Sequence, residues 1–326
     1  MRYRVSDLAD LNIRSVSKNA KGVIYYIDTS SVFQGHFREA NRYSAIADAP
    51  SRARRLAQEG DTVISMVRPS NEHIGFIDFD TDNYVFSTGF VVVHPNSEIV
   101  EPFYLYLLLS LDSTTRYLQQ IAETSTTAYP SVKVEDIGNL SFDIPEISKQ
   151  RKIVHKIRII EQKIKLNQEI NDNLLEISRQ NYLKILSSKI AQHGRLSDLA
   201  EVTMGQSPKS DTYNFECNGL PLLNGAADFR GSISPSKWTS DPKRIAHKGE
   251  YIFGVRATVG LTRKIFRDYA IGRGTGAARA RKEEFDEFLY FTLEELFNYY
   301  THVGSGSVYV NISKNEFEEF KCMIPN

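Results

Sequence analysis

The sequence is poor in the residues that stabilise small secreted domains and structural metal sites. Its 326 residues include only two cysteines, Cys217 and Cys322, and seven histidines that stand singly. Two cysteines are too few for a disulfide framework, and no Cys or His pair has the spacing of a structural zinc site. We therefore expect this chain to hold no metal ion and no disulfide network.

Long apolar runs are also missing. The longest extends from Phe103 to Leu109, which is far short of the roughly 20 residues that a membrane-spanning helix needs. The opening residues Met1-Arg2-Tyr3-Arg4 lead to Asp7 without the apolar stretch of a secretory signal. We expect a cytoplasmic protein without a membrane partner.

A net charge is absent, because 40 basic residues face 40 acidic residues. The basic residues are unevenly distributed, however, and residues 228–282 hold 13 of them against 4 acidic residues. A clustered excess of Lys and Arg is typical of a surface that contacts phosphate groups. The alternative is an ordinary solvated surface of mixed charge.

What the sequence does contain is an internal repeat, in which five segments recur in the same order. The matched pairs are Val5–Asp10 with Leu196–Glu201, Gly60–Arg68 with Gly249–Arg256, Ile74-Gly75 with Val259-Gly260, Thr124–Val132 with Gly304–Ile312, and Ile144-Pro145 with Ile324-Pro325. Generic strand patterns are the alternative explanation, but they do not account for the conserved order. We predict two domains of one fold, in which Arg68 superposes on Arg256 and Tyr129 on Tyr309.

Each half mixes short strands with helices. Apolar runs bounded by turn residues predict strands at 62–67, 86–93 and 251–255, and helical apolar spacing predicts helices at 103–120 and 285–300. The fold class is therefore α+β, with two related globular domains joined by a long coiled-coil-type helix. The predicted domains are 1–145 and 193–326, with the spacer helix in 146–192.

The spacer segment has the composition of a long helix. Residues 148–190 contain no Pro or Gly, and Ile153, Ile157, Ile160 and Ile164 are spaced four, three and four residues apart. This spacing predicts a coiled-coil seam.

The same heptad places Asn167 and Asn171 on the seam before Leu174, and Gly194 is the expected helix stop. At 1.5 Å per residue the helix would be roughly 65 Å long. The alternative is a helix that buries its apolar side on its own domains.

Motifs for catalysis are missing or poorly placed. No P-loop, GxSxG, HExxH or Asn-Pro-Pro-aromatic sequence occurs. Gly272–Ala277 has the glycines of a dinucleotide site, but its counterpart in the repeat leads into an extended apolar segment rather than a helix. Glu161-Gln162-Lys163 and Glu319-Phe320-Lys321 have the residue types of metal-dependent nucleases. The first triplet lies on the charged face of the predicted helix, so we expect no catalytic residue.

The combination of these features resembles the specificity subunit of type I restriction-modification enzymes. The segment Gly249–Arg256 is similar to the strand-turn segment of that family, and Gly205-Gln206-Ser207-Pro208 is similar to its domain-opening loop. Pro145, Gln150 and Ile153 resemble the family's entry into the long helix.

The resemblance implies a non-catalytic subunit that binds double-stranded DNA. Each domain would read one half of a bipartite target. The helix would dock two modification subunits, which carry S-adenosylmethionine, and a restriction subunit would join them. The partner-docking residues would be Ile153, Ile157, Ile160, Ile164 and Leu174.

The family also has a second long helix after the second domain, whereas this sequence stops at Asn326. Either this is a subunit shortened at its C-terminus, or a partner chain, which could be a second copy of this one, supplies that helix. Two alternatives from other classes stay open, namely a self-sufficient DNA methyltransferase or nuclease and a coiled-coil adaptor for protein partners.

Polar residues on loops that contain glycine are the candidates for DNA contact, because such side chains can reach phosphates and base edges. The candidates are Lys18, Gln34, Arg68, Asn71, Ser87 and Thr88 in the first half and Gln206, Ser207, Lys209, Asn224, Arg256, Arg273 and Arg279 in the second.

Overall fold

A computed structural model gives the fold of the chain. It describes all residues except 18, 125–129, 189–190, 256–258, 304–311 and 326. Contacts between Cα atoms divide the chain into two compact units, Met1–Leu166 and Asn167–Asn326. Among the described residues, no helix is long and apolar enough to cross a membrane.

The first unit is built on two four-stranded sheets, with strand orders β2-β11-β8-β9 and β6-β3-β10-β7, and on the two-stranded pairs β1-β12 and β4-β5. The strands are β1 (Arg2–Arg4), β2 (Ala9–Leu11), β3 (Ile24–Ile27), β4 (Val32–Phe33), β5 (His36–Phe37), β6 (Asn41–Tyr43), β7 (Ala53–Arg55), β8 (Thr62–Ser65), β9 (Ile74–Phe76), β10 (Tyr84–Ser87), β11 (Phe90–Pro95) and β12 (Ser141–Asp143). The helices are α1 (Val5–Leu8), α2 (Pro102–Leu109), α3 (Asp112–Glu123) and α4 (Val134–Gly138), with short 3-10 turns η1 (Thr29–Ser31), η2 (Ile46–Asp48) and η3 (Pro69–Asn71).

Strand β11 explains the layering of this unit, because successive side chains of a strand point to opposite faces. Val91 and Val93 pack in one cluster with Leu105 of α2 and Leu118 of α3. Phe90 and Val92 pack in another cluster with residues of the second sheet. The first sheet is therefore covered by helices on one face and by the second sheet on the other.

The second unit has the same plan, but its second sheet has a fifth strand and its described residues contain no equivalent of the β4-β5 pair. Its sheets are ordered β14-β22-β19-β20 and β15-β17-β16-β21-β18, and its two-stranded pair is β13-β23. The strands are β13 (Ala191–Arg195), β14 (Ala200–Met204), β15 (Tyr213–Asn214), β16 (Leu220–Leu223), β17 (Lys237–Thr239), β18 (Ile245–Ala246), β19 (Tyr251–Gly254), β20 (Thr262–Lys264), β21 (Tyr269–Ile271), β22 (Thr275–Ala280) and β23 (Lys321–Pro325). The helices are α6 (Leu196–Leu199), α7 (Asp286–Val303) and α8 (Lys314–Glu318), and the 3-10 turns are η4 (Ser210–Thr212), η5 (Ala226–Phe229) and η6 (Glu283–Phe285).

The predicted repeat is confirmed by the topology of the two units. Helices α1 and α6 both carry an aspartate as their third residue, and its carboxylate accepts a hydrogen bond from the backbone N–H just before the helix, Arg4 to Asp7 at 2.8 Å and Arg195 to Asp198 at 2.9 Å. The glycines that precede β8 and β19 both have a positive φ of about 90°. The strand pairs β2-β11-β8-β9 and β14-β22-β19-β20 match one for one. Tyr129, Tyr309 and Arg256 lie outside the described residues, so the two predicted superpositions that involve them stay predictions.

One matched pair of the repeat is wrong. Ile74 lies opposite Ile64 in the first unit, whereas Thr262 lies opposite Phe253 in the second. Strand register therefore pairs Ile74 with Thr262 and not with Val259. Gly260 stands in the turn before β20 with a φ of +93°, while Gly75 is inside a strand, so the shared glycine was a local coincidence.

The predicted helix at 103–120 is two helices, because Ser110 ends α2 with a hydrogen bond from its hydroxyl to the Leu107 carbonyl, 3.1 Å long. Side chains of Ser and Thr compete in this way with helical hydrogen bonds. The predicted strand at 86–93 is likewise two strands, separated by a turn at Thr88 and Gly89. The helix predicted at 285–300 is α7.

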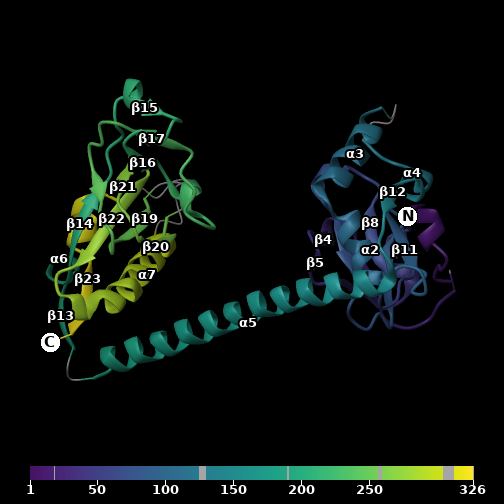
Figure 1. Cartoon of the computed structure of the whole chain (residues 1–326). Helices are drawn as coiled ribbons and strands as arrows, with labels where there is room; N and C mark the ends of the chain where they lie inside the picture. The colour runs from purple at the N-terminus through teal and green to yellow at the C-terminus, as the bar shows by residue number, and fades with distance from the viewer. Residues whose placement is uncertain (18, 125–129, 189–190, 256–258, 304–311, 326) are drawn as a thin grey trace. The chain divides into compact units, whose positions relative to one another are not determined.

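The long helix α5 (Ile147–Leu186) is the predicted spacer helix. It ends before Gly194, which lies instead in β13 opposite Cys322 of β23. Near its start, Gln150 is fully buried and its amide donates to the Pro145 carbonyl at 2.8 Å. Near its end, Tyr182 is buried against Phe288 of α7. The two ends are thus packed against different units, as Figure 1 shows.

Candidate nucleic-acid interface

The candidate site of each unit lies where two parallel strands end. The second sheet of each unit contains one parallel pair, β3 with β10 and β16 with β21. The register pairs Ile27 with Phe86 and Leu223 with Ile271. Loops that follow these strands therefore start at the same edge of the sheet. In the first unit they carry Asp28 and Thr88, and in the second they carry Asn224 and Arg273.

Three glycines let the loops of the second unit approach closely. A Cβ atom on Gly205 would lie 2.1 Å from the Gly272 carbonyl oxygen, and one on Gly274 would lie 2.4 Å from the Asn224 carbonyl oxygen. The backbones are joined by hydrogen bonds from Gly205 N to Thr275 O at 2.9 Å and from Gly274 N to Asn224 O at 3.1 Å. Backbone hydrogen bonds thus hold the loops together, and the polar side chains are not needed for this contact.

A chain of hydrogen bonds orients the side chain of Asn224. The backbone N–H of Arg273 donates to the Ser207 hydroxyl at 3.4 Å, and that hydroxyl donates to Asn224 Oδ1 at 3.5 Å. The amide oxygen of Asn224 faces Ser207. The NH2 group of the same amide has no hydrogen-bond partner among the described residues. The guanidinium of the exposed Arg273 is equally unpaired in the described part of the chain.

Three sequence-predicted residues, Ser207, Asn224 and Arg273, are therefore brought together, with the exposed Gln206 beside them. Asn and Arg are the side chains that pair with two groups at once on adenine and guanine edges. Lys209 is exposed at the start of η4, where its carbonyl accepts the Thr212 hydroxyl at 2.7 Å. The arrangement offers donors fixed by a rigid backbone, which is what base reading requires.

Arg279 does not belong to this cluster. It lies near the far end of β22, about 13 Å along the strand from Thr275. In the strand register it stands opposite Glu201 of the neighbouring strand β14. It faces an open pocket of about 560 Å³ that also receives Lys248, Lys264 and Arg281. Arg279 was predicted to lie on a loop, but it lies in β22, and its contact with DNA stays a prediction.

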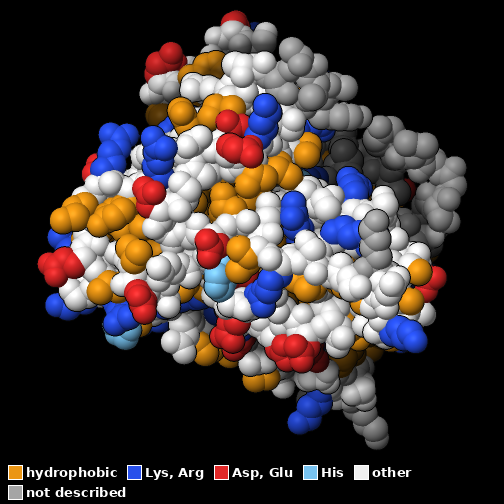
Figure 2. All heavy atoms as spheres, turned by 90° about the vertical axis from the view of Figure 1, so that its right-hand side faces the viewer, with side chains coloured by type: hydrophobic (Ala, Val, Ile, Leu, Met, Phe, Trp, Pro, Cys, Tyr) orange, Lys and Arg blue, Asp and Glu red, His pale blue; other side chains and the backbone are white. Residues whose placement is uncertain are grey.

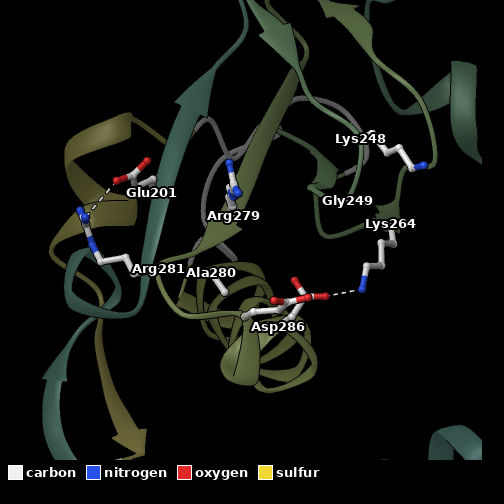
Figure 3. Close-up of a pocket in the computed structure, with 9 residues that line it drawn as sticks. Glu201, Lys248, Gly249, Lys264, Arg279, Ala280, Arg281 and Asp286 are labelled. Atoms are coloured by element: carbon white, nitrogen blue, oxygen red, sulfur yellow. Dashed lines mark hydrogen bonds and ion pairs between the residues drawn. The ribbon is translucent and has the colours of Figure 1, made fainter.

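The pocket at Arg279 is polar but of mixed charge. Figure 3 shows Arg281 paired with Glu201, at 3.0 Å, and Lys264 paired with Asp286. Burial, and then the neighbouring Asp286 carboxylate, raises the pKa of Tyr251 beside it. Arg279 thus shares the pocket with two satisfied ion pairs and is a weak site for an anion.

In the first unit, Gln34, Arg68 and Asn71 come together around Glu72. The backbone N–H of Gln34 donates to the Glu72 carbonyl at 3.0 Å, and its side chain donates to the Glu72 carboxylate. The residues Gln34, Arg68 and Glu72 all have a positive φ, between 46° and 54°. Non-glycine residues rarely adopt this conformation, and such strain is concentrated at functional sites.

Ser87 is not available to a base. It is fully buried, and its hydroxyl accepts a hydrogen bond from Gly89 N at 3.2 Å. Thr88 is half-buried and its N–H donates to the Arg52 carbonyl at 2.8 Å. Arg52 and Asp28 form an ion pair at 3.5 Å next to it. Sequence reasoning missed these two charged residues, although the repeat places Asp28 at the position of Asn224.

Two predicted residues, Lys18 and Arg256, lie outside the described residues. The predicted basic face of 228–282 is also less positive than its composition indicates, because several of its cations have acidic partners. These pairs are Lys243 with Asp241, Lys264 with Asp286, Arg281 with Glu201 and Lys282 with Glu284. Figure 2 views the molecule from the side on which the first unit lies in Figure 1, and on that face too cationic and anionic side chains are interspersed.

No metal-binding group of three or more His, Cys, Asp or Glu residues occurs in the part of the chain that the structure describes. Neither of the two Glu-x-Lys triplets is part of such a group, because the glutamate of each pairs with an arginine. Glu161 lies on α5, within 3.7 Å of Arg158, and Glu319 pairs with Arg195 at 2.7 Å. The glycines of Gly272–Ala277 lead into β22 rather than into a helix, which is the extended segment that their counterpart in the repeat indicated.

Comparison with known proteins gives consistent relatives. The chain is 35% identical over 177 residues to the HindI specificity subunit of Haemophilus influenzae, covering 54% of this chain and 38% of the relative. It is 26% identical over 293 residues to the putative MjaX specificity subunit of Methanocaldococcus jannaschii, covering 82% of this chain and 68% of the relative. The chain thus spans well under half the length of the first of these relatives.

The solved structure of a type I restriction-modification S subunit from M. genitalium has the same fold, with a TM-score of 0.60 at 14% identity, and covers 100% of this chain and 84% of that one. The model of the type I restriction modification DNA specificity domain matches residues 2–176 and again residues 191–326. With nearly all of its residues in two copies of that domain, on two units of one topology, the chain belongs to the type I restriction-modification specificity family.

Proposed function

We propose that the chain is the non-catalytic DNA-recognition subunit of a type I restriction-modification complex and that each unit reads one half of a bipartite target. The proposal is supported mainly by the two loop sites, one in each unit, which lie at the equivalent edge of the second sheet, where the two parallel strands end. Asp28 and Thr88 occupy the positions in the first unit that Asn224 and Arg273 occupy in the second. A carboxylate accepts from cytosine N4, whereas Asn and Arg read adenine and guanine. The two half-sites therefore differ in sequence.

The partners in this proposal are double-stranded DNA, two modification subunits and a restriction subunit. S-adenosylmethionine binds to the modification subunits, and this chain carries no cofactor in the cytoplasm where the complex works. The family membership supports the assembly, and the apolar face of α5 supplies a docking surface. Ile160, Ile164 and Leu174 are 57%, 53% and 56% exposed.

Ile153 and Ile157 contribute less to docking, because they are half-buried on the first unit's side of α5. Further exposed apolar residues widen the face of the helix beyond the predicted seam, namely Ile159, Leu166, Ile170, Leu175, Ile177 and Leu183. So broad a face accommodates a modification subunit together with a second long helix, from another chain or from a second copy of this one.

The deciding experiment is the sequencing of methylated adenines in cells that express this chain with its modification subunit. The expected result is one motif made of two half-sites separated by a nonspecific spacer. Asp28→Asn and Asn224→Asp form a matched pair of variants, since each exchanges an amide and a carboxylate of nearly equal size. Asp28→Asn should alter one half of the motif only and Asn224→Asp the other half only.

A motif without two halves, or two variants that alter the same half, would contradict the proposal. The enzyme alternative predicts methylation or cleavage by the purified chain with S-adenosylmethionine or Mg²⁺ alone. The adaptor alternative predicts no binding of duplex DNA that weakens steeply as salt rises, because such a slope arises from phosphate contacts.

A further inference from the structure

The second unit carries a rigid aromatic projection beside its candidate base-reading residues. Strand β15 has no counterpart in the four-stranded sheet of the first unit, and it adds a fifth strand at the edge through its pairing with β17. Phe215 directly follows this strand and is 70% exposed. The edge of the sheet is therefore extended in one unit only, and it ends in a large apolar side chain in water.

Hydrogen bonds inside the turn hold Phe215 in place. The Asn214 amide donates to the Asn218 carbonyl at 2.8 Å, and the Asn218 N–H donates back to Asn214 Oδ1 at 2.9 Å. Gly219 closes the turn with a φ of +87°, and a Cβ atom there would lie 2.1 Å from the Thr239 carbonyl oxygen. The backbone on either side of Phe215 is thus fixed, so the ring is presented without a further cost of ordering the loop.

A cation accompanies the ring. Lys237 Nζ lies 5.9 Å from the ring centroids of both Tyr213 and Phe215. Tyr213 and Lys237 also line an open pocket of about 350 Å³ that Asn224 and Gly225 line as well. The projection and the candidate base-reading residue therefore share one continuous surface.

We propose that Phe215 is a wedge that enters the stack of base pairs next to the half-site read by the second unit, with Lys237 on the adjoining phosphate. This proposal rests on the DNA-recognition function proposed above. Apolar side chains such as Phe that enter duplex DNA between base steps unstack them and kink the helix, and the proteins that use them also contact the groove with Lys and Arg. An acidic protein could pair with Lys237, but it would give no role to one exposed phenylalanine ring. Duplex DNA gives a role to both side chains, so we take it as the partner.

The test uses the complex of the full chain with its modification subunit and a short duplex that carries the methylation motif, labelled at both ends for energy transfer. Phe215→Ala should weaken binding about 5- to 100-fold, the range expected for the loss of one aromatic contact with a base. It should leave the salt slope unchanged and remove the energy-transfer change that accompanies a kink. Phe215→Trp should restore both, whereas Lys237→Met should lower the salt slope by about one.

Phe266→Ala is the matched control, because Phe266 lies in the same unit, is 78% exposed and is outside the candidate site. It should bind and bend DNA like the unchanged chain. Cys217, in the same turn as Phe215, is an exposed native probe, and Cys322 is buried. Alkylation of Cys217 should slow when DNA binds.

Three outcomes would overturn the wedge. The first is equal affinity of Phe215→Ala and the unchanged complex. The second is weaker binding by Phe215→Ala with an unaltered energy-transfer change, since Phe215 would then touch DNA without inserting. The third is full protection of Cys217 by the modification subunit before DNA is added. Failure of the unchanged complex to bind any duplex would overturn the recognition function itself, and the wedge with it.

Discussion

Asn224 Oδ1 occupies the space in which a Cβ atom of Gly272 would stand, since the two positions are only 2.1 Å apart. The amide oxygen therefore rests against bare backbone, and Ser207 holds it from the other side. The glycine directly after β21, the second strand of the parallel pair, thus determines which group of Asn224 faces outward. We therefore predict that the DNA specificity proposed for the second unit depends on this glycine as well as on its polar loop side chains.

Gly272→Ala should displace the Asn224 amide and change the half-site read by the second unit. The new methyl group would also meet Asn224 Cα, at 3.1 Å, so we expect a loss of stability of about 1–3 kcal/mol, as for other overpacked sites. Sequencing of methylated DNA and urea denaturation check the two effects. Gly231→Ala is the control, because a Cβ there meets nothing within 4 Å. An unaltered motif in a folded Gly272→Ala protein would contradict the role of this glycine.

Arg273→Ala and Arg279→Ala should now differ, although the sequence indicated the same role for both. Arg273 stands beside Asn224 with its guanidinium free, so its loss should weaken specific binding by about 1–3 kcal/mol. Arg279 faces the ion-paired pocket, so its loss should change affinity less than about twofold. Fluorescence anisotropy titrations at several salt concentrations measure both. Equal losses of affinity in the two variants would show that Arg279 also contacts DNA.

The repeat and α5 could be predicted from the sequence because both are encoded locally. The four-three-four spacing of Ile153, Ile157, Ile160 and Ile164 needs no knowledge of the fold, and α5 was placed to within a few residues at both ends. The predicted end of the helix was a few residues too late, because Gly194 is a plausible helix stop. Pairing of β13 with β23 instead draws the chain into a strand earlier, and such pairing is not visible in a local pattern.

The candidate site was predicted only in part, because its residues are distant in the sequence. Ser207, Asn224 and Arg273 were each selected as loop residues, but only the parallel register of β16 and β21 brings their loops together. Ser87 was selected as a loop residue but is buried, because it is the last residue of strand β10. Phe215 was missed because an exposed phenylalanine gives no signal until its edge strand is known.

The capping box of α8 should make stability depend on pH. The Ser313 N–H donates to the Glu316 carboxylate at 2.7 Å, and hydrogen bonds from Ser313 lower the pKa of Glu316. A carboxylate whose pKa is lowered by folding stabilises the folded state above its unfolded pKa of about 4.3. That contribution is lost as the pH falls through the lower pKa of the folded state.

Glu316→Gln should therefore lower the free energy of unfolding by about 0.3–1 kcal/mol near neutral pH, and by less at pH 3. Urea denaturation at both pH values measures the difference, with Glu318→Gln on the same helix as the control. A cost that is the same at both pH values would show that the charge of Glu316 is unimportant.

The two cysteines should differ sharply in reactivity. Burial, and then the charge of Asp198, raises the pKa of the Cys322 thiol to about 12, whereas Cys217 is exposed in the turn after β15. The thiolate is the reactive form, so iodoacetamide at pH 8 should modify Cys217 completely before it modifies Cys322. Peptide mass spectrometry follows both sites, and denaturation in urea should abolish the difference. Comparable rates in the folded chain would mean that β23 does not stay paired with β13.

The exposed seam of α5 should be required for assembly and dispensable for folding. Ile160, Ile164 and Leu174 are more than half exposed in the isolated chain, so their replacement by Gln removes little buried apolar area there. Each contributes up to roughly 1.5–3 kcal/mol once a partner covers it.

The triple Gln variant should therefore keep its urea midpoint but lose at least about 100-fold in affinity for the modification subunit or for a second copy, the equivalent of about 2.7 kcal/mol. Light scattering after size-exclusion chromatography measures both complexes. Gln162→Ala with Glu169→Ala, on the opposite face of the helix, should change neither. If the triple variant assembles as well as the control, the partners bind elsewhere and the apolar face of α5 has another purpose.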